Sequence, residues 1–325
     1  MIINKIKNNL SKYMLWYTLL AIVGGIFLGH IWNLKFLSKY IIFVVFIIIY
    51  PMMINLSLST LKRIRETQKP LIEAMILNFI YAPSLMWILT SLFINDPKIK
   101  MALMLLSIAP ASSMGLGYIG LAEGRMLSGS IIVATAFILS IFVYPVLGHY
   151  LALGANIPVP LSLILKNLLL VLILPFILGI ATREYIEKKY GIEKFNKVKP
   201  YFSSITLISL YVLIFFIFAS KANLVLKNYT TILLLFPVAI LFYGISIFFT
   251  LLVNKKLLSF EYGQHQAVVF TSVSKNIALT IAILTIFGKE GQYMAMFPAI
   301  MALFQAPFLM TYLKFSKRIK RWFEK

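Results

Sequence analysis

The sequence predicts an all-α membrane protein with ten transmembrane helices, and three observations support this fold class. First, 61% of the 325 residues are hydrophobic and 13% are charged, whereas soluble domains are about half apolar and about one quarter charged. Second, the apolar residues form stretches of about twenty residues, the length that crosses a bilayer as a helix. Third, Lys and Arg concentrate in alternate connections between these stretches, as in membrane proteins with many spans.

Ten apolar stretches follow one another along the chain, and each ends near charged, polar or helix-breaking residues. We number them spans 1 to 10. They cover residues 13–32, 40–57, 71–94, 101–122, 128–153, 161–181, 201–220, 229–253, 265–287 and 293–313. Span 1 is longer than the apolar core of a signal peptide and no small-residue cleavage site follows it, so we expect it to stay in the protein.

The distribution of basic residues predicts the orientation. Twenty-two of the 31 Lys and Arg lie at the two termini or in the even-numbered connections, including a long basic loop expected at residues 182–200. Seven lie on the other side, and Lys166 and Lys275 lie inside spans. Because basic connections are retained in the cytoplasm, both termini are expected there, in a multi-pass protein of the plasma membrane. Removing one span would move all later connections to the opposite side of the membrane and abolish the excess of basic residues on one side. The excess therefore also supports ten spans.

Composition also narrows the function classes. The chain has no cysteine, three histidines and ten carboxylates, which excludes disulfides and thiol chemistry and disfavours a metal site, a cofactor or an acid–base enzyme. The net charge of +21 lies between apolar spans rather than on one face of a domain, so no nucleic-acid partner is expected. The expected partners are the lipid bilayer and a small-molecule substrate, and a homodimer stays open. An intramembrane enzyme or a sensor without transport is the disfavoured alternative.

The simplest division of the chain is two repeats of five spans, residues 1–157 and 158–325. Because five is odd, two like halves must lie in opposite orientations, the inverted-repeat plan common among secondary transporters. The fourth span of each half carries polar, small or helix-breaking residues at mid-depth, within residues 106–118 and 271–280. Each of these spans is followed by a Glu-Gly pair, at residues 123–124 and 290–291. We therefore expect two broken helices at corresponding places.

Lys275 lies in the middle of the apolar residues 266–287, about 15 Å from either end at 1.5 Å per helical residue. A charge at that depth costs a few kcal/mol unless it faces protein or water, and it is too deep for the side chain to reach the membrane surface. No other span places a carboxylate at mid-depth, since Glu73 and Glu261 lie near span ends. We therefore expect Lys275 to bind and release a proton or to hold an anion.

Hydrogen-bonding groups around the two breaks complete the expected site. Pro110 removes one helical hydrogen bond, and backbone groups freed in lipid must be met by protein or water. Taken singly, Pro110 could mark an ordinary kink, and each hydroxyl could pack two helices together. Their concentration at mid-depth favours a substrate or coupling-ion site, with no catalytic residue and no metal ligand. The expected site residues are Pro110, Ala111, Ser112, Ser113, Thr271, Ser274, Lys275 and Asn276.

These motifs resemble the arsenical-resistance permeases and their relatives in the bile acid:sodium symporter superfamily. The resemblance runs from span 1 to span 10. Its most specific pieces are residues 50–53, 106–114, 121–124, 157–160 and 271–282. The resemblance implies ten spans in an inverted repeat, with a panel domain (spans 1, 2, 6 and 7) and a core domain (spans 3, 4, 5, 8, 9 and 10). It also implies that substrate is handled where spans 4 and 9 cross.

Three departures from the family pattern bear on the chemistry. Arsenite permeases have a cysteine where this chain has Ala111, a carboxylate in the motif that here reads 276–279, and commonly an asparagine where this chain has Lys275. These differences argue against thiol-based arsenite handling, and a fixed ammonium argues against sodium coupling. We expect a secondary active transporter of a small solute that works by alternating access. The alternative is an organic-anion transporter, for a small carboxylate or a bile-acid-like solute, coupled to protons or uncoupled.

Overall fold

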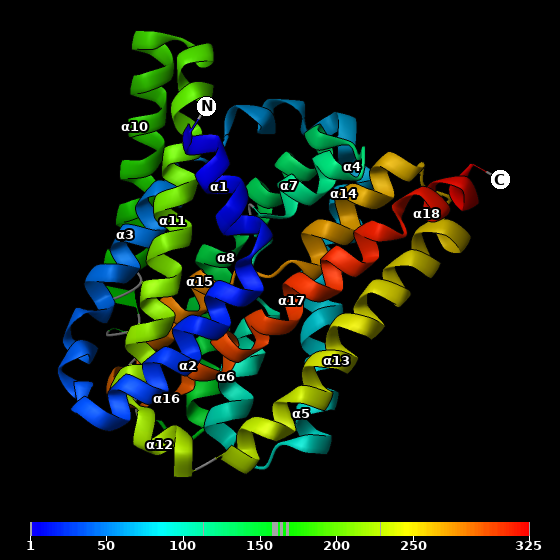
Figure 1. Cartoon of the computed structure of the whole chain (residues 1–325). Helices are drawn as coiled ribbons and strands as arrows, with labels where there is room; N and C mark the ends of the chain where they lie inside the picture. The colour runs from blue at the N-terminus through cyan, green and yellow to red at the C-terminus, as the bar shows by residue number, and fades with distance from the viewer. Residues whose placement is uncertain are drawn as a thin grey trace.

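The computed structural model describes residues 2–112, 114–157, 162, 165, 166, 169–227 and 229–324, and in this part of the chain the regular structure is helical. The expected all-α class is therefore confirmed. Figure 1 shows long helices that run between two ends of the molecule, with both chain termini toward the same end. Seven of the described helical segments are long and apolar enough to cross a membrane.

One group of helices consists of α2 (Met14–Trp32), α3 (Ile41–Ile54), α10 (Leu174–Tyr190) and α11 (Ile192–Ser220). In this group α11 packs along both α2 and α3, and α10 packs on α3. The short helix α1 (Ile2–Lys12) lies against α11. We call α2, α3, α10 and α11 the first helix group.

A second helix group surrounds the two expected breaks, with α14 packed on α4, α8 and α13, and α17 packed on α6, α13 and α15. Its helices are α4 (Gln68–Ile76), α5 (Ala82–Phe93), α6 (Pro97–Ser107), α7 (Met114–Leu121), α8 (Met126–Gly154), α13 (Tyr229–Leu252), α14 (Tyr262–Val273), α15 (Ile277–Thr285) and α17 (Met296–Lys314). Every residue of α15 is buried, so this helix lies deep in the protein.

Shorter helical segments join these elements or cover their ends. They are η1 (Leu34–Tyr40), η2 (Ser59–Thr67), η3 (Leu77–Tyr81), η4 (Leu169–Ile173), α12 (Ala222–Lys227), η5 (Val253–Leu257), α16 (Gly288–Met294) and α18 (Ser316–Phe323). Of these, η3 continues α4 directly into α5, so that the expected span 3 is one helical rod with a π-helical turn inside it.

Three of the ten expected spans are not among the seven long apolar helices. Span 4 is divided into α6 and α7, and span 9 into α14 and α15, so each piece is too short to cross a bilayer alone. Span 6 begins outside the described residues and continues as η4 and α10. The number ten and the inverted repeat therefore remain predictions.

The prediction of a basic loop at residues 182–200 is wrong, because this segment is helical on both sides of Gly191. Helix α10 continues to Tyr190, Gly191 turns the chain with a φ of +84°, and α11 begins at Ile192. The charged residues of this segment are good helix formers, and they pair along the helix: Arg183 lies 2.7 Å from Glu187, four residues later. The Arg183 guanidinium also lies 4.5 Å from the centre of the Phe195 ring. Helical propensity and these contacts make the segment a helical hairpin.

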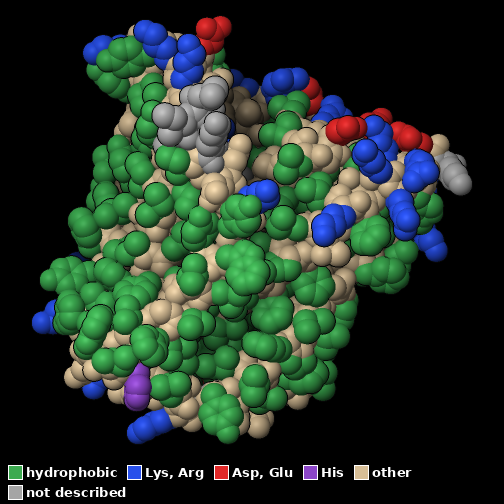
Figure 2. Space-filling view, in the orientation of Figure 1, with side chains coloured by type: hydrophobic (Ala, Val, Ile, Leu, Met, Phe, Trp, Pro, Cys, Tyr) green, Lys and Arg blue, Asp and Glu red, His purple; other side chains and the backbone are tan. Residues whose placement is uncertain are grey.

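The surface carries the features of a protein that spans a membrane several times. Figure 2 shows a broad band of apolar side chains, with Lys and Arg gathered toward the end where the termini lie. Many large apolar side chains of the described residues are exposed, for example Leu92 at 72%, Phe142 at 67% and Trp16 at 63%. So large an apolar surface is stable only when a bilayer covers it.

Two glycines allow α2 and α11 to approach each other closely. A Cβ atom at Gly25 would lie 2.9 Å from the carbonyl oxygen of Phe215, and one at Gly29 would overlap the backbone of Ala219. The small-residue spacing Gly-x-x-x-Gly therefore serves helix packing here, as it does in many membrane proteins.

Replacing Gly29 with alanine should separate α2 from α11, because the added methyl group meets rigid backbone. We expect a loss of about 1–3 kcal/mol, as for other overpacked sites, seen as a lower thermal unfolding midpoint of the purified protein. Gly24→Ala is the matched control, since a Cβ atom at Gly24 would meet nothing within 4 Å. Equal midpoints for the two variants would contradict the close approach.

Candidate functional site

Two helices are broken at the positions that the sequence predicts. Helix α6 ends at Ser107 and α7 begins at Met114, with Pro110 between them, where a proline cannot continue the helix. Helix α14 ends at Val273 and α15 begins at Ile277. Asn276 caps α15, because its Oδ1 atom accepts a hydrogen bond of 3.1 Å from the backbone N–H of Leu279.

The two broken segments pair with each other through their backbones. Ala111 and Lys275 form an antiparallel bridge. On one side of it the N–H of Ser112 donates to the carbonyl of Ser274 over 2.8 Å, and on the other the N–H of Asn276 donates to the carbonyl of Pro110 over 3.0 Å. Each break thus satisfies polar groups that the other leaves free, as a site within a membrane requires.

Lys275 is completely buried beside this pairing. Its Nζ atom donates to the Asn78 side-chain oxygen over 2.7 Å and lies 3.5 Å from the Asn78 carbonyl oxygen. Its backbone N–H donates to Gln305 Oε1 over 2.9 Å, and the Gln305 amide donates back to the Lys275 carbonyl over 3.2 Å. Among the described residues, no carboxylate lies within ion-pair distance of Nζ. The ammonium is therefore held by the uncharged side chain and carbonyl of Asn78.

Asn276 faces in another direction. Its side-chain nitrogen lies 3.2 Å from the Met52 sulfur on α3, whereas Lys275 contacts residues of η3 and α17. A cavity of about 50 Å³ lies between the helix groups, and its polar lining comes from Asn55, Ser57, Ser130, Lys199 and Asn276. Ala111 also lines the cavity, but Lys275 does not. A cavity of this size admits a few waters or a small solute, not a large ligand.

The structure brings together six of the eight expected site residues at the paired breaks, and the seventh lies in the helix just before them. Pro110, Ala111, Ser112, Ser274, Lys275 and Asn276 meet at the paired breaks. Thr271 lies within α14, and its hydroxyl donates to the Ala267 carbonyl of the same helix over 2.6 Å. Ser113 lies outside the described residues. The buried Ser274 hydroxyl makes no hydrogen bond to a described residue, so it remains available to another group.

Sequence analysis missed the two amides that hold Lys275. The Asn78 amide, rather than a carboxylate, contacts the ammonium, and Gln305 binds the backbone N–H and carbonyl of Lys275. A signal was present, because each is the one Asn or Gln within its expected span, 71–94 or 293–313. A lone amide in the middle of an apolar span needs hydrogen-bond partners as much as a lone lysine does.

A separate buried polar cluster contains Glu73, which the sequence placed near the end of span 3. With the Asn254 amide nitrogen turned toward it, the Glu73 carboxyl accepts a hydrogen bond from Asn254. The Asn254 oxygen then accepts from His265 Nδ1 over 3.0 Å, and His265 Nε2 lies 2.7 Å from the Tyr312 hydroxyl. The Glu73 carboxyl is therefore bonded to Asn254 and is not a partner of Lys275.

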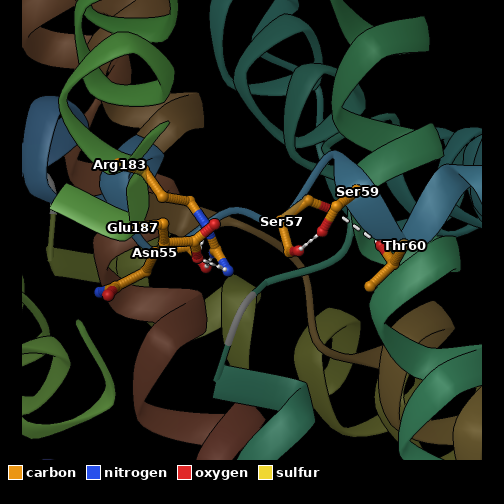
Figure 3. A network of polar contacts seen from close by, with 6 residues as sticks. All are labelled: Asn55, Ser57, Ser59, Thr60, Arg183 and Glu187. Carbon is orange, nitrogen blue, oxygen red and sulfur yellow. Dashed lines mark hydrogen bonds and ion pairs between the residues drawn. The ribbon is translucent and has the colours of Figure 1, made fainter. Parts of the chain in front are cut away.

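A polar network fixes the end of α3 where it borders the cavity (Figure 3). The Arg183 guanidinium donates to Glu187 over 2.8 Å and to the Asn55 carbonyl over 3.1 Å. The Ser57 hydroxyl lies 3.0 Å from that of Ser59, a contact that Figure 3 marks with a dashed line. Because Asn55 and Ser57 line the cavity, these bonds set the shape of its wall.

Broken helices that meet among apolar helices are common in membrane transporters. The comparison with protein families agrees with this class: the chain belongs to the Sodium Bile acid symporter family, a family of membrane transporters, whose profile matches residues 42–228.

Relatives align with nearly the whole chain. An uncharacterized transporter of Synechocystis is 25% identical over 97% of this chain and 90% of its own length. The arsenical-resistance protein Acr3 of Alkaliphilus metalliredigens is 22% identical over 96% of this chain and 94% of its own length. The Acr3 protein of Corynebacterium glutamicum is 25% identical over 84% of this chain and 80% of its own length.

Replacing Gln305 with leucine should destabilise the paired breaks, because it leaves the N–H and carbonyl of Lys275 without their side-chain partner. Each buried polar group left unpaired costs about 1–3 kcal/mol, so we expect a clear drop in the thermal unfolding midpoint. Gln68→Leu, at an exposed position, is the control. If both variants unfold at the wild-type temperature, Gln305 does not support the pairing.

Proposed function

We propose that the protein is a secondary active transporter that moves a small solute across the plasma membrane by alternating access. One observation carries this proposal: the backbone pairing of Ala111 with Lys275, beside a cavity to which both helix groups contribute. Paired breaks expose backbone and small polar groups to a solute at a point where continuous helices would hide them.

The two helix groups support a division into panel and core domains. The panel domain comprises spans 1, 2, 6 and 7, which correspond to α2, α3, α10 and α11, and these helices pack on one another. The core domain comprises the remaining six spans, in two inverted repeats of five spans each. The matching breaks in spans 4 and 9 support this repeat.

Both termini face the cytoplasm in this proposal. The support is the excess of basic residues on that side, 22 against seven, together with the position of both ends toward one end of the molecule (Figure 1).

The solute would bind to the polar side chains of the cavity, with Asn276 and Ser130 as hydrogen-bonding groups. The chain has no cysteine, and the residue between α6 and α7 that lines the cavity is Ala111, which offers only its backbone. Arsenite, suggested by the two Acr3 relatives, would therefore be held as an uncharged hydroxylated species through hydrogen bonds. A second candidate is an organic anion such as a small carboxylate, which the ammonium of Lys199 in the cavity lining favours.

Lys275 would act as the proton-binding group. Its ammonium is enclosed by protein and held by Asn78, and it does not line the cavity, so it is placed to affect the core rather than to bind the solute directly. A fixed positive charge at the breaks also disfavours a bound sodium ion nearby, so we propose that transport is coupled to protons or uncoupled.

Lys275→Met should abolish the dependence of transport on pH, because methionine fills a similar volume but binds no proton. Proteoliposomes with an imposed pH gradient measure the effect as solute uptake. Lys275→Arg keeps the positive charge and should also lose the dependence, since arginine does not titrate in this range. Lys166→Met, at an exposed position, is the control. Wild-type pH profiles in both Lys275 variants would remove Lys275 from this role.

Exchange of a labelled solute across proteoliposome membranes separates the two substrate classes. Arsenite and small carboxylates are each tested as the labelled solute and as competitor, with and without sodium. Asn276→Ala should lower the exchange of the true substrate about tenfold through the loss of one hydrogen bond. Lys199→Ala should lower exchange of a carboxylate but not of arsenite. Exchange of neither class by the wild-type protein would contradict both candidates.

A further inference from the structure

A second and larger cavity lies at the end of the molecule opposite the termini. Its volume is about 380 Å³, within the range of small-molecule sites. The walls come from the ends of α2 and α11, from η1 and α12 on one side, and from α16 on the other; Figure 1 shows α12 and α16 near this end. We call it the lysine pocket, because Lys35, Lys221, Lys227 and Lys289 line it.

The lysines of this pocket are unusual for their side of the protein. Seven lysines lie in the connections of this end, and four of them meet in this one cavity although they come from three separate connections. No Asp or Glu is among the described residues that line it. Like charges gathered in one pocket repel one another, and this cost is removed when an anion binds among them.

The two carboxylates of this end are engaged outside the pocket. Asp96 caps α6 by accepting a hydrogen bond of 2.8 Å from the Lys98 backbone, and Glu290 forms an ion pair of 2.8 Å with the Lys98 side chain. Neither lines the cavity, and so the pocket lysines present their charge to it without a carboxylate on its wall.

The charges in the pocket also act on one another. Lys221 lies just beyond the end of α11 and is half-buried, and this burial lowers the pKa of its ammonium. The carboxylate of Glu290 raises this pKa, whereas the positive charges of Lys289 and Lys35 lower it further. Lys289 and Lys35 come from other segments of the chain than Lys221, so the charges of three segments interact within the pocket.

Hydrogen bonds between the walls hold the pocket open. The Gln292 amide of α16 donates to the Ser38 carbonyl of η1 over 3.3 Å, and His30 of α2 lies 2.8 Å from the Asn223 side-chain oxygen of α12. Asn33, in the left-handed conformation with φ of +49°, turns the chain from α2 into η1 at the rim. The lysines are therefore placed by a wall that is already formed, which reduces the ordering cost of binding.

From this geometry we propose that the lysine pocket is a binding site for a small anion that carries a phosphate or carboxylate group. The site is separate from the cavity at the paired breaks and shares no lining residue with it. Its occupant is either a free anion in solution or the phosphate of an anionic lipid headgroup, which presents the same chemistry to the lysines.

Inorganic phosphate is the probe, titrated calorimetrically into the purified full-length protein at low ionic strength. The double variant Lys221→Gln with Lys289→Gln should bind phosphate at least about tenfold more weakly, because two charges leave the pocket. The matched control is Lys39→Gln with Lys100→Gln, which removes two charges from the same end but none from the pocket. It should bind phosphate within about twofold of the wild type.

Thermal unfolding provides a readout that does not depend on heat of binding. Phosphate should raise the midpoint of the wild type and of the control variant but not that of the pocket variant. Without phosphate, the pocket variant should have a higher unfolding midpoint than the wild type, because two of the four lysine charges that repel one another have been removed. A wild type that neither binds phosphate nor is stabilised by it, or equal behaviour of the two double variants, would overturn the proposal.

Nanodiscs of phosphatidylcholine alone or with phosphatidylglycerol identify the source of the anion. Weaker phosphate binding with phosphatidylglycerol in the wild type, and no such change in the pocket variant, assigns the pocket to a lipid headgroup. Equal binding in both lipids assigns it to a free anion. These experiments need no transported solute, so their failure and that of the transport proposal are distinguishable.

Discussion

The backbone pairing of Ala111 with Lys275 is the interaction on which the rest of the site depends. A helix that breaks inside a membrane frees N–H and carbonyl groups that lipid cannot satisfy. Here two breaks meet, and the hydrogen bonds that join Ser112 to Ser274 and Asn276 to Pro110 serve both at once. Each break therefore supplies hydrogen-bond partners that the other needs.

The pairing also decides which way each side chain points. Lys275 and Asn276 are neighbours in an extended segment, so they face different parts of the protein: Lys275 contacts Asn78 and Gln305 in the second helix group, and Asn276 contacts Met52 in the first. The charge of Lys275 therefore lies within one helix group, and the Asn276 amide lies at the boundary between the two groups.

The sequence predicted the helical class, both breaks and the burial of Lys275, because these follow from local composition and from the cost of a charge in lipid. It failed at residues 182–200, where charge was interpreted as a loop although Arg183 and Glu187 support a helix. It also failed to find Asn78 and Gln305 as partners of Lys275. Asn78 and Gln305 lie far from Lys275 in the sequence, and helix packing brings them next to it. The spacing of residues along the sequence does not show how these distant helices pack.

The two cavities are separate and share no lining residue. The smaller one reaches Asn276, and the lysine pocket lies beyond the ends of α2 and α11. The two helix groups meet where α15 packs on α3 and α17 packs on α2, with all of α15 buried. Both α3 and α15 consist mainly of apolar residues, so their contact adds apolar packing, which has no fixed direction, to the hydrogen bonds of the paired breaks.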